Sequence, residues 1–255
     1  MLFLLLSIYL TLEFIKPFLA GRHFREGYNL TMTKRYPFAI DELKEAINYA
    51  PWETHYMMQL GRTMEEMAGI LSTTQQRIYT YKELELLYLK MIKMDPLNPW
   101  FKNRLAIIYE KLQNHIPSEA SKYKVLAKKS HYLASENDKN NPLFQLNYAY
   151  YLHQNAKTLS DLDAAIPYYQ AVIKMDDRML EAQFNLADIY RQYKKNNESL
   201  TQYLSIYEKN PNFRDISLAI ASIYIEQNKY NEALPFLEKQ LKIKPNNIEI
   251  LRNIA

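Results

Sequence analysis

The feature that most constrains the fold of this chain is a regular repeat in the spacing of its small and large residues. Counting from Ala187, residues of matching character follow at fixed offsets, and the same series starts again at Ala221. The two series are Ala187, Tyr190, Ser199, Tyr203, Ile206 and Pro211, and then Ala221, Tyr224, Ala233, Leu237, Gln240 and Pro245. Gly27 and Gly61 are separated by the same interval near the start of the chain. A period of about 34 residues predicts pairs of antiparallel helices that stack on one another to bury their apolar faces.

The small residues explain the spacing. Two helices approach closely only where side chains are small, so we expect each Gly or Ala that opens a series to lie at the crossing of two helices. The pattern resembles the tetratricopeptide repeat, which implies an all-α superhelix of helix pairs. We therefore expect a tetratricopeptide solenoid over residues 20–255, with about six repeats and the start of a seventh, behind an N-terminal hydrophobic helix.

The middle repeats are longer than the period. After Gly61 the matching second-helix residues come 11 positions late, and after Ala106 they come nine positions late. The fourth repeat begins at Ala149. The second-helix positions predicted for these three repeats are Leu84, Tyr88 and Met91, then Ala127, His131 and Ala134, and then Ala164, Tyr168 and Ala171.

Composition excludes several classes of function. The 32 basic and 28 acidic residues give a balanced surface, which argues against a nucleic-acid partner. The absence of cysteine excludes thiolate metal sites and cysteine nucleophiles, and four scattered glycines exclude a phosphate-binding loop. None of the five histidines has a metal-site spacing, and His131 falls on a packing position. We therefore expect no catalytic residues, no metal and no cofactor.

The N-terminal segment, residues 1–19, is strongly apolar. Leu2 to Leu12 contain no charge, and Pro17 is expected to end or kink the segment. This stretch predicts a membrane segment, either a last transmembrane helix or a signal anchor, with a cleaved signal and a buried leading helix as alternatives. Lys16, Arg22 and Arg25 follow the apolar run, which by the positive-inside rule favours a cytoplasmic solenoid unless earlier membrane helices set the orientation.

Two short motifs go beyond the general repeat. They are Ala50-Pro51-Trp52-Glu53, followed by Tyr56 and Leu60-Gly61-Arg62, and Pro96-Leu97-Asn98-Pro99. With the apolar lead-in, they resemble the C-terminal part of bacterial O-antigen ligase/polymerase family membrane proteins, over the part of the chain that precedes Ala106. The resemblance implies a last transmembrane helix that runs into extracytoplasmic repeats. The catalytic membrane part of that family has no counterpart in this sequence.

The sequence thus supports two main hypotheses. In the first, the chain is a membrane-tethered scaffold that binds a protein or peptide, in a surface-polysaccharide pathway of the O-antigen type, with the repeats on the periplasmic or outer face. In the second, it is a C-terminal fragment of an O-antigen ligase-type transferase. A cytoplasmic adaptor with a packed leading helix is the remaining alternative.

The expected binding surface is the inner groove of the solenoid, lined by the first helix of each repeat. Its polar residues are predicted to be Arg62, Asn103, Tyr150, Asp188 and Arg191. Its other predicted residues are Met58, Ile107, Leu146, Phe184, Leu218 and Ser222. Tyrosines on the repeat pattern, and Trp52 and Trp100 after the proline turns, are expected to pack between repeats.

The sequence ends on the pattern of a new repeat. Ala255 stands one full period after Ala221, and Ile248, Leu251 and Ile254 open an apolar stripe. A terminal helix of a solenoid needs a polar outer face, and this stripe is too apolar for one. We therefore expect either a truncated reading frame or a capping partner at this end.

Overall fold

The structure is a computed structural model that describes the backbone of residues 2–243 and the side chains of residues 15–242. The described backbone contains helices and no strand. The α-helices are α1 (Leu2–Met32), α2 (Tyr36–Tyr49), α3 (Thr54–Ile70), α4 (Thr74–Met94), α5 (Pro99–His115), α6 (Ala120–Asn137), α7 (Pro142–Gln154), α8 (Leu159–Leu162), α9 (Ile166–Met175), α10 (Leu180–Gln192), α11 (Asn196–Lys209), α12 (Ile216–Glu226) and α13 (Tyr230–Ile243). A short 3-10 helix, Pro117–Glu119, precedes α6.

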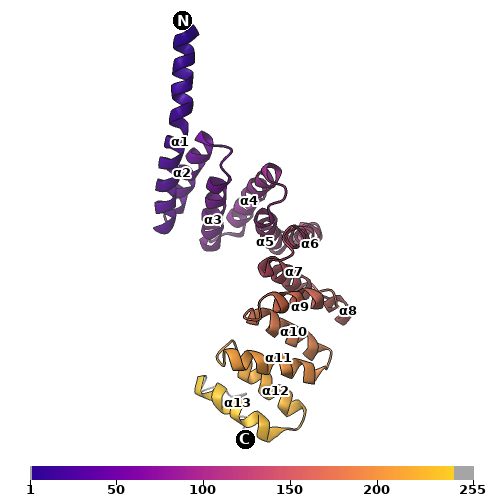
Figure 1. Ribbon diagram of the computed structural model, residues 1–255. Helices are drawn as coiled ribbons and strands as arrows, with labels where there is room; N and C mark the ends of the chain where they lie inside the picture. Colours follow the sequence, from indigo (N-terminus) through magenta and orange to yellow (C-terminus); the bar gives the residue numbers. More distant parts are fainter. Residues whose placement is uncertain (1, 244–255) are drawn as a thin grey trace. The chain divides into compact units, whose positions relative to one another are not determined.

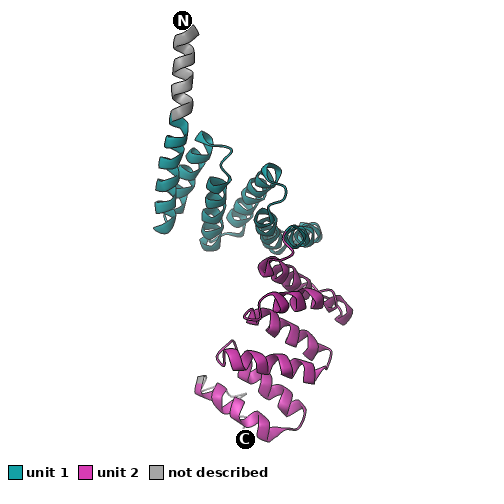
Figure 2. Cartoon of the chain, in the orientation of Figure 1, with its two compact units in different colours: residues 1–137 teal, residues 138–255 magenta. Residues whose placement is uncertain are grey.

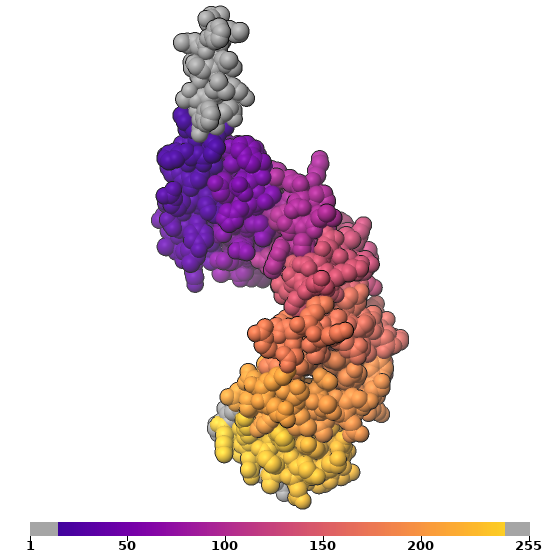
Figure 3. All heavy atoms as spheres, viewed as in Figure 1, coloured from indigo at the N-terminus to yellow at the C-terminus, as the bar shows by residue number. Residues whose placement is uncertain are grey.

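The chain divides into two compact units, unit 1 (residues 1–137) and unit 2 (residues 138–255), shown in Figure 2. In unit 1, α1 pairs with α2, α3 with α4 and α5 with α6; in unit 2, α7 pairs with α9, α10 with α11 and α12 with α13 (Figure 1). Consecutive pairs within a unit pack on one another, and their atoms are in contact in the space-filling view (Figure 3). The predicted start of a seventh repeat, residues 248–255, lies outside the described residues.

The small residues lie where the helices of a pair come closest. A Cβ atom on Gly27 would lie 2.7 Å from Leu43 Cγ, and one on Gly61 would lie 2.7 Å from the Tyr88 hydroxyl oxygen. Ala106, Ala149, Ala187 and Ala221 are fully buried at the same position of their repeats. The close helix crossings expected from the sequence are therefore present.

The three repeats without an insert share one turn between their helices. The residues at this turn, Lys34, Lys194 and Asn228, have φ values of 60°, 57° and 59°. In each turn the next residue donates its backbone N–H to a carbonyl five positions earlier, as in the 2.9 Å bond from Lys195 to Tyr190. This is the Schellman arrangement, which ends a first helix and directs the chain straight into the second.

The two longest repeats absorb their extra residues by lengthening helices. Helix α4 has 21 residues and begins after Thr73, whose side chain accepts a hydrogen bond from the Gln76 amide. The predicted packing positions of α4 are confirmed, since Leu84, Tyr88 and Met91 are fully buried. In α6, Ala127 and Ala134 are fully buried and His131 is 3% exposed, which confirms the packing positions predicted for this helix.

The fourth repeat differs from the prediction by one residue. The buried residues of its second helix are Ala165, Tyr169 and Val172, whereas Ala164 is exposed and the neighbouring Tyr168 and Ala171 are only partly buried. The prediction is wrong because the insert holds one more residue than the sequence pattern indicates. That insert contains the single-turn helix α8, which begins with a capping box between Thr158 and Asp161.

This register can be tested with two neighbouring alanines. Replacing Ala165 with leucine should lower the free energy of unfolding by about 1–3 kcal/mol, because a larger side chain would be forced into a filled helix crossing. Replacing the exposed Ala164 with leucine should change it by less than about 0.5 kcal/mol. Urea denaturation followed by circular dichroism measures both, and equal effects would contradict the observed register.

The first helix contradicts one of the two alternatives expected at Pro17, namely that the segment ends there. Helix α1 does not end at Pro17 but continues to Met32. Ala20 and Thr31 are buried in its second half, and this packing on α2 and α3 offsets the roughly 3 kcal/mol that a proline costs in a helix interior. Among the residues that the structure describes, no helix has the length and apolar character of a membrane span. Most of the predicted segment, the side chains of residues 1–14, lies outside the described part.

The two tryptophans are placed differently from the expectation. Trp52 is 60% exposed, so the prediction that it packs between repeats is wrong, and Trp100 is 46% exposed and is only partly covered. Trp52 lies in the turn that leads into α3, and Trp100 lies in the first turn of α5. The residues that fill the space between helices are tyrosines instead, including the fully buried Tyr88, Tyr123 and Tyr169.

Candidate partner-binding groove

Unit 2 contains a pocket of about 320 Å³ between α10 and α12, with α11 behind it. Both α10 and α12 are first helices of their repeats, so the pocket lies on the face where the sequence predicts partner binding. Its lining residues are Phe184, Asp188, Arg191, Tyr203, Asp215, Leu218, Ala219, Ser222 and Ile225. A pocket of this size, at the lower end of ligand-binding cavities, has room for one or two side chains of a partner.

Helical spacing places these residues on one face. Phe184, Asp188 and Arg191 are four and three positions apart in α10, so their side chains stand above one another. Leu218 and Ser222 occupy the same two positions in α12, one period after Phe184 and Asp188. The pocket is therefore a direct product of the repeat.

The apolar wall of the pocket is held by aromatic packing. The ring of Phe184 lies 5.3 Å from the ring of Tyr203 and 6.0 Å from the ring of Phe213, measured between centroids. The guanidinium of Arg214 lies 4.9 Å from the Phe184 centroid, within the range of a cation–π interaction. These contacts fix the Phe184 ring, which leaves a preformed apolar surface for a partner side chain.

The polar rim carries charges of both signs. Asp188 accepts a 3.1 Å hydrogen bond from the Gln192 side chain, and its Oδ2 lies 3.6 Å from Nε2 of His153 on α7. The interaction with His153 lowers the pKa of Asp188 below its usual value, which keeps the carboxylate ionised near neutral pH. Arg191 donates a 2.7 Å hydrogen bond to Glu226 on α12.

Sequence reasoning did not identify His153 as part of this surface. Its ring is 9% exposed and also lies 3.4 Å from the Tyr169 hydroxyl, so it connects the core of the fourth repeat to Asp188. A signal was present, because His153 stands four positions after Ala149 just as Arg191 stands four positions after Ala187. Metal-site spacing, the usual sign of a functional histidine, does not reveal this position.

The five predicted polar residues are distributed over both units. Asp188 and Arg191 line one pocket in unit 2, and Tyr150 on α7 is 47% exposed. In unit 1, Arg62 is exposed on α3, whereas Asn103 is only 4% exposed and lies inside the packing surface of α5. The structure thus brings two of the five together in a pocket and leaves Asn103 inaccessible to an incoming peptide. Within the described residues, no group of three or more potential ligands could hold a metal ion.

Comparisons with known proteins agree with this architecture. A tetratricopeptide repeat sequence model matches residues 215–247. No curated protein sequence matches the chain. Among solved structures, the chain is similar to YrrB, described as a TPR protein with an unusual peptide-binding site, with a TM-score of 0.59 and 16% identity over 82% of this chain and 96% of that one.

Two further structures share the fold. PilF of Pseudomonas aeruginosa gives a TM-score of 0.65 with 12% identity over 93% of this chain and 97% of that one. TTC0263 of Thermus thermophilus gives a TM-score of 0.51 with 18% identity over 81% and 99%. At these identities the likeness concerns the fold. The chain therefore has the all-helical tetratricopeptide solenoid fold and carries a tetratricopeptide repeat at residues 215–247.

Proposed function

We propose that this chain is a non-catalytic scaffold that binds a peptide segment of a partner protein in the groove of unit 2. The observation that carries the proposal is the pocket between α10 and α12, with a fixed apolar wall and an ionised Asp188 at its rim. An apolar side chain of the partner would enter between Phe184 and Leu218. A basic or hydrogen-bond-donating group beside it would face Asp188. The peptide-binding site described for the similar protein YrrB supports this mode of recognition.

Exposed polar residues on the first helices would extend the contact beyond the pocket. Tyr150 is available in unit 2, and Arg62 is available in unit 1. Each would add hydrogen bonds to a partner segment longer than the pocket itself. The pocket supplies the buried anchor point, where interfaces concentrate most of their binding free energy.

We further propose that residues 1–19 tether the scaffold to a membrane and that the repeats face the periplasm or the outer surface. The uncharged run from Leu2 to Leu12 supports tethering. The orientation and a role in surface-polysaccharide assembly rest on the sequence resemblance of the part that precedes Ala106.

Selection from a random-sequence peptide library tests the groove. Peptides selected on the full chain should share an apolar residue next to a basic one. Replacing Leu218 with aspartate should weaken their binding at least tenfold, because it places a negative charge where the apolar side chain of the peptide would enter. Isothermal titration calorimetry with the best peptide measures the change.

The matched control is Asn212→Asp, which adds the same charge at an exposed position outside the pocket-lining set. This variant should bind like the unaltered chain. If Leu218→Asp and Asn212→Asp bind the selected peptides equally well, the groove of unit 2 is not the recognition site.

A further inference from the structure

Three large apolar side chains occupy one equivalent position in the repeats of unit 1. Phe18, Trp52 and Leu97 each stand nine positions before the small residue of their first helix, and each follows a proline. They are 72%, 60% and 77% exposed. We call these three residues the apolar edge. Three exposed apolar side chains at a repeated position make a regular feature, in contrast to the scattered apolar residues of an ordinary surface.

Unit 2 carries polar residues at the same position. Asn140, Arg178 and Asn212 stand nine positions before Ala149, Ala187 and Ala221, and all three are exposed. The repeat itself therefore does not require an apolar side chain here. The large apolar residues at this position are therefore a feature of unit 1 and not of the repeat.

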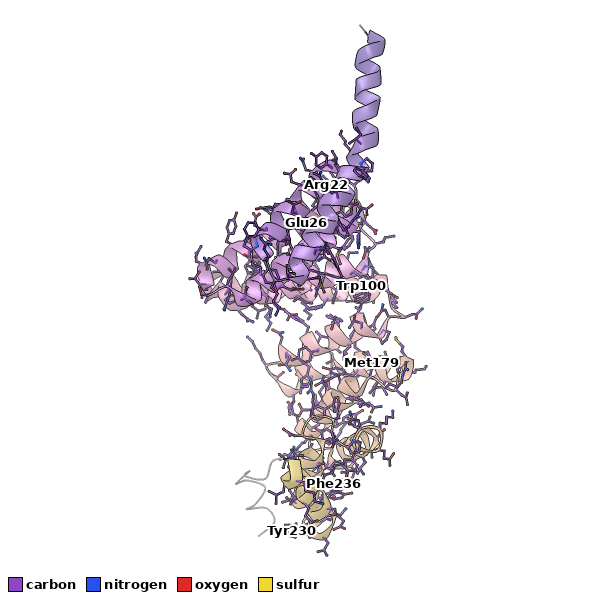
Figure 4. The ribbon with its side chains drawn as sticks, turned by 90° about the vertical axis from the view of Figure 1, so that its left-hand side faces the viewer. Arg22, Glu26, Trp100, Met179, Tyr230 and Phe236 are labelled. Atoms are coloured by element: carbon purple, nitrogen blue, oxygen red, sulfur yellow. The ribbon has the colours of Figure 1, made fainter. Side chains whose placement is uncertain are left out.

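The apolar edge lies where the first helices of unit 1 begin. Trp52 and Leu97 precede the first residues of α3 and α5, and Phe18 precedes the part of α1 that packs on α2. Helix α1 alone continues past this edge, because it has 31 residues where α3 has 17 (Figure 1). Trp100, which is 46% exposed, lies close to this edge at the start of α5 and is labelled in Figure 4.

The extension of α1 carries the uncharged run from Leu2 to Leu12. Leu12 and Phe18 are six positions apart, which corresponds to about 9 Å along the helix axis at roughly 1.5 Å per residue. Side chains on a helix lean toward its N-terminus, so Phe18 leans toward the apolar run. If that run enters a bilayer, Phe18 reaches the headgroup layer, which is the depth where aromatic side chains concentrate in membrane proteins.

We propose that the apolar edge of unit 1 contacts the surface of a lipid bilayer, with Phe18, Trp52 and Leu97 inserted among the headgroups. This proposal rests on the tethering proposed above and specifies how the folded unit meets the membrane. Insertion of three apolar side chains would restrict the motion of unit 1 on the membrane, while the polar residues at the same position leave unit 2 without this contact. The contact should withstand high salt, because it is formed by apolar groups.

The chain reports on this contact directly, since Trp52 and Trp100 are its only tryptophans. In the full chain carrying Trp100→Phe, Trp52 is the sole tryptophan. This variant is mixed with phosphatidylcholine vesicles that contain a lipid brominated near the headgroup. We expect Trp52 emission to shift to shorter wavelength and to be quenched, at low and at high salt. Adding Phe18→Ser and Leu97→Ser should reduce the quenching.

Equivalent positions of unit 2 provide the control. In a chain with Trp52→Phe and Trp100→Phe, a single tryptophan is introduced by Asn212→Trp at the matching position of the sixth repeat. This tryptophan should stay unquenched while the chain sediments with the vesicles.

The possible failures are distinct. A chain that sediments with vesicles but leaves Trp52 unquenched is tethered without contact of the edge, which overturns the inference alone. A chain that neither sediments nor shows quenching overturns the tether as well. Trp52 emission that shifts only when a protein partner is added would assign the edge to that partner and would also overturn the inference. Equal quenching at positions 52 and 212 would show non-specific adsorption and would overturn it too.

Discussion

Truncation of Tyr88 to alanine is expected to lower the free energy of unfolding of unit 1 by about 3–5 kcal/mol, the range for removing a large aromatic side chain from a packed core. Tyr88 is fully buried in α4, and its hydroxyl donates a 2.6 Å hydrogen bond to Glu65 on α3. Glu65 also forms a 3.2 Å ion pair with Arg104 on α5. One side chain thus fills the space between helices and donates a hydrogen bond to a partly buried carboxylate. Urea denaturation followed by Trp52 and Trp100 fluorescence reports on unit 1.

Two other tyrosine variants separate the contribution of the buried ring of Tyr88 from that of its hydroxyl hydrogen bond. Tyr88→Phe keeps the ring and should cost about 1.5–3 kcal/mol, the range for a hydrogen bond to a charged group. Tyr79 lies on the same helix and is 67% exposed, so Tyr79→Ala should change stability by less than about 0.5 kcal/mol. If Tyr88→Ala is no worse than Tyr79→Ala, the described packing of α4 is incorrect.

The position of Tyr88 was predictable from sequence even though its repeat is stretched. A solenoid keeps the same order of small and large residues at each helix crossing, so the pattern is recovered after the insert that follows Gly61. The fourth repeat shows the limit of this reasoning. Ala164 and Ala165 are both small, so sequence could not choose between them, and only the capped turn at Thr158 fixes the register.

The candidate site, too, could be predicted only in part from the sequence. The repeat places Asp188 and Arg191 on the first helix of the fifth repeat, and both line the pocket. Asn103 stands three positions before Ala106, as Phe184 stands three positions before Ala187, but Asn103 lies buried, because burial depends on the neighbouring helices and not on the position alone. The contact of His153 with Asp188 joins two repeats, and a pattern read one repeat at a time does not reveal it.

A second large effect is expected at Gly27. Glycine is normally a poor helix residue, and its replacement by alanine at an open site should stabilise a helix by up to about 1 kcal/mol. At Gly27 the added Cβ would lie 2.7 Å from Leu43 Cγ and 3.1 Å from the backbone oxygen of Ala39. Because Leu43 is fully buried, it has little room to move. We expect Gly27→Ala to destabilise unit 1 by about 2 kcal/mol after the gain in helix propensity is subtracted from the cost of overpacking.

Gly21 on the same helix is the matched control, because a Cβ there would meet nothing within 4 Å. Gly21→Ala should therefore leave stability unchanged or raise it, so the two substitutions should differ clearly in the same urea titration. A double-mutant cycle locates the cause. When Leu43→Ala removes the atoms that the new Cβ would meet, the added cost of Gly27→Ala should largely disappear, leaving a coupling free energy of about 1–2 kcal/mol. If the full cost of Gly27→Ala persists in the Leu43→Ala background, the added Cβ clashes with the backbone oxygen of Ala39 on α2. If Gly27→Ala stabilises the chain, α1 and α2 do not cross at this glycine.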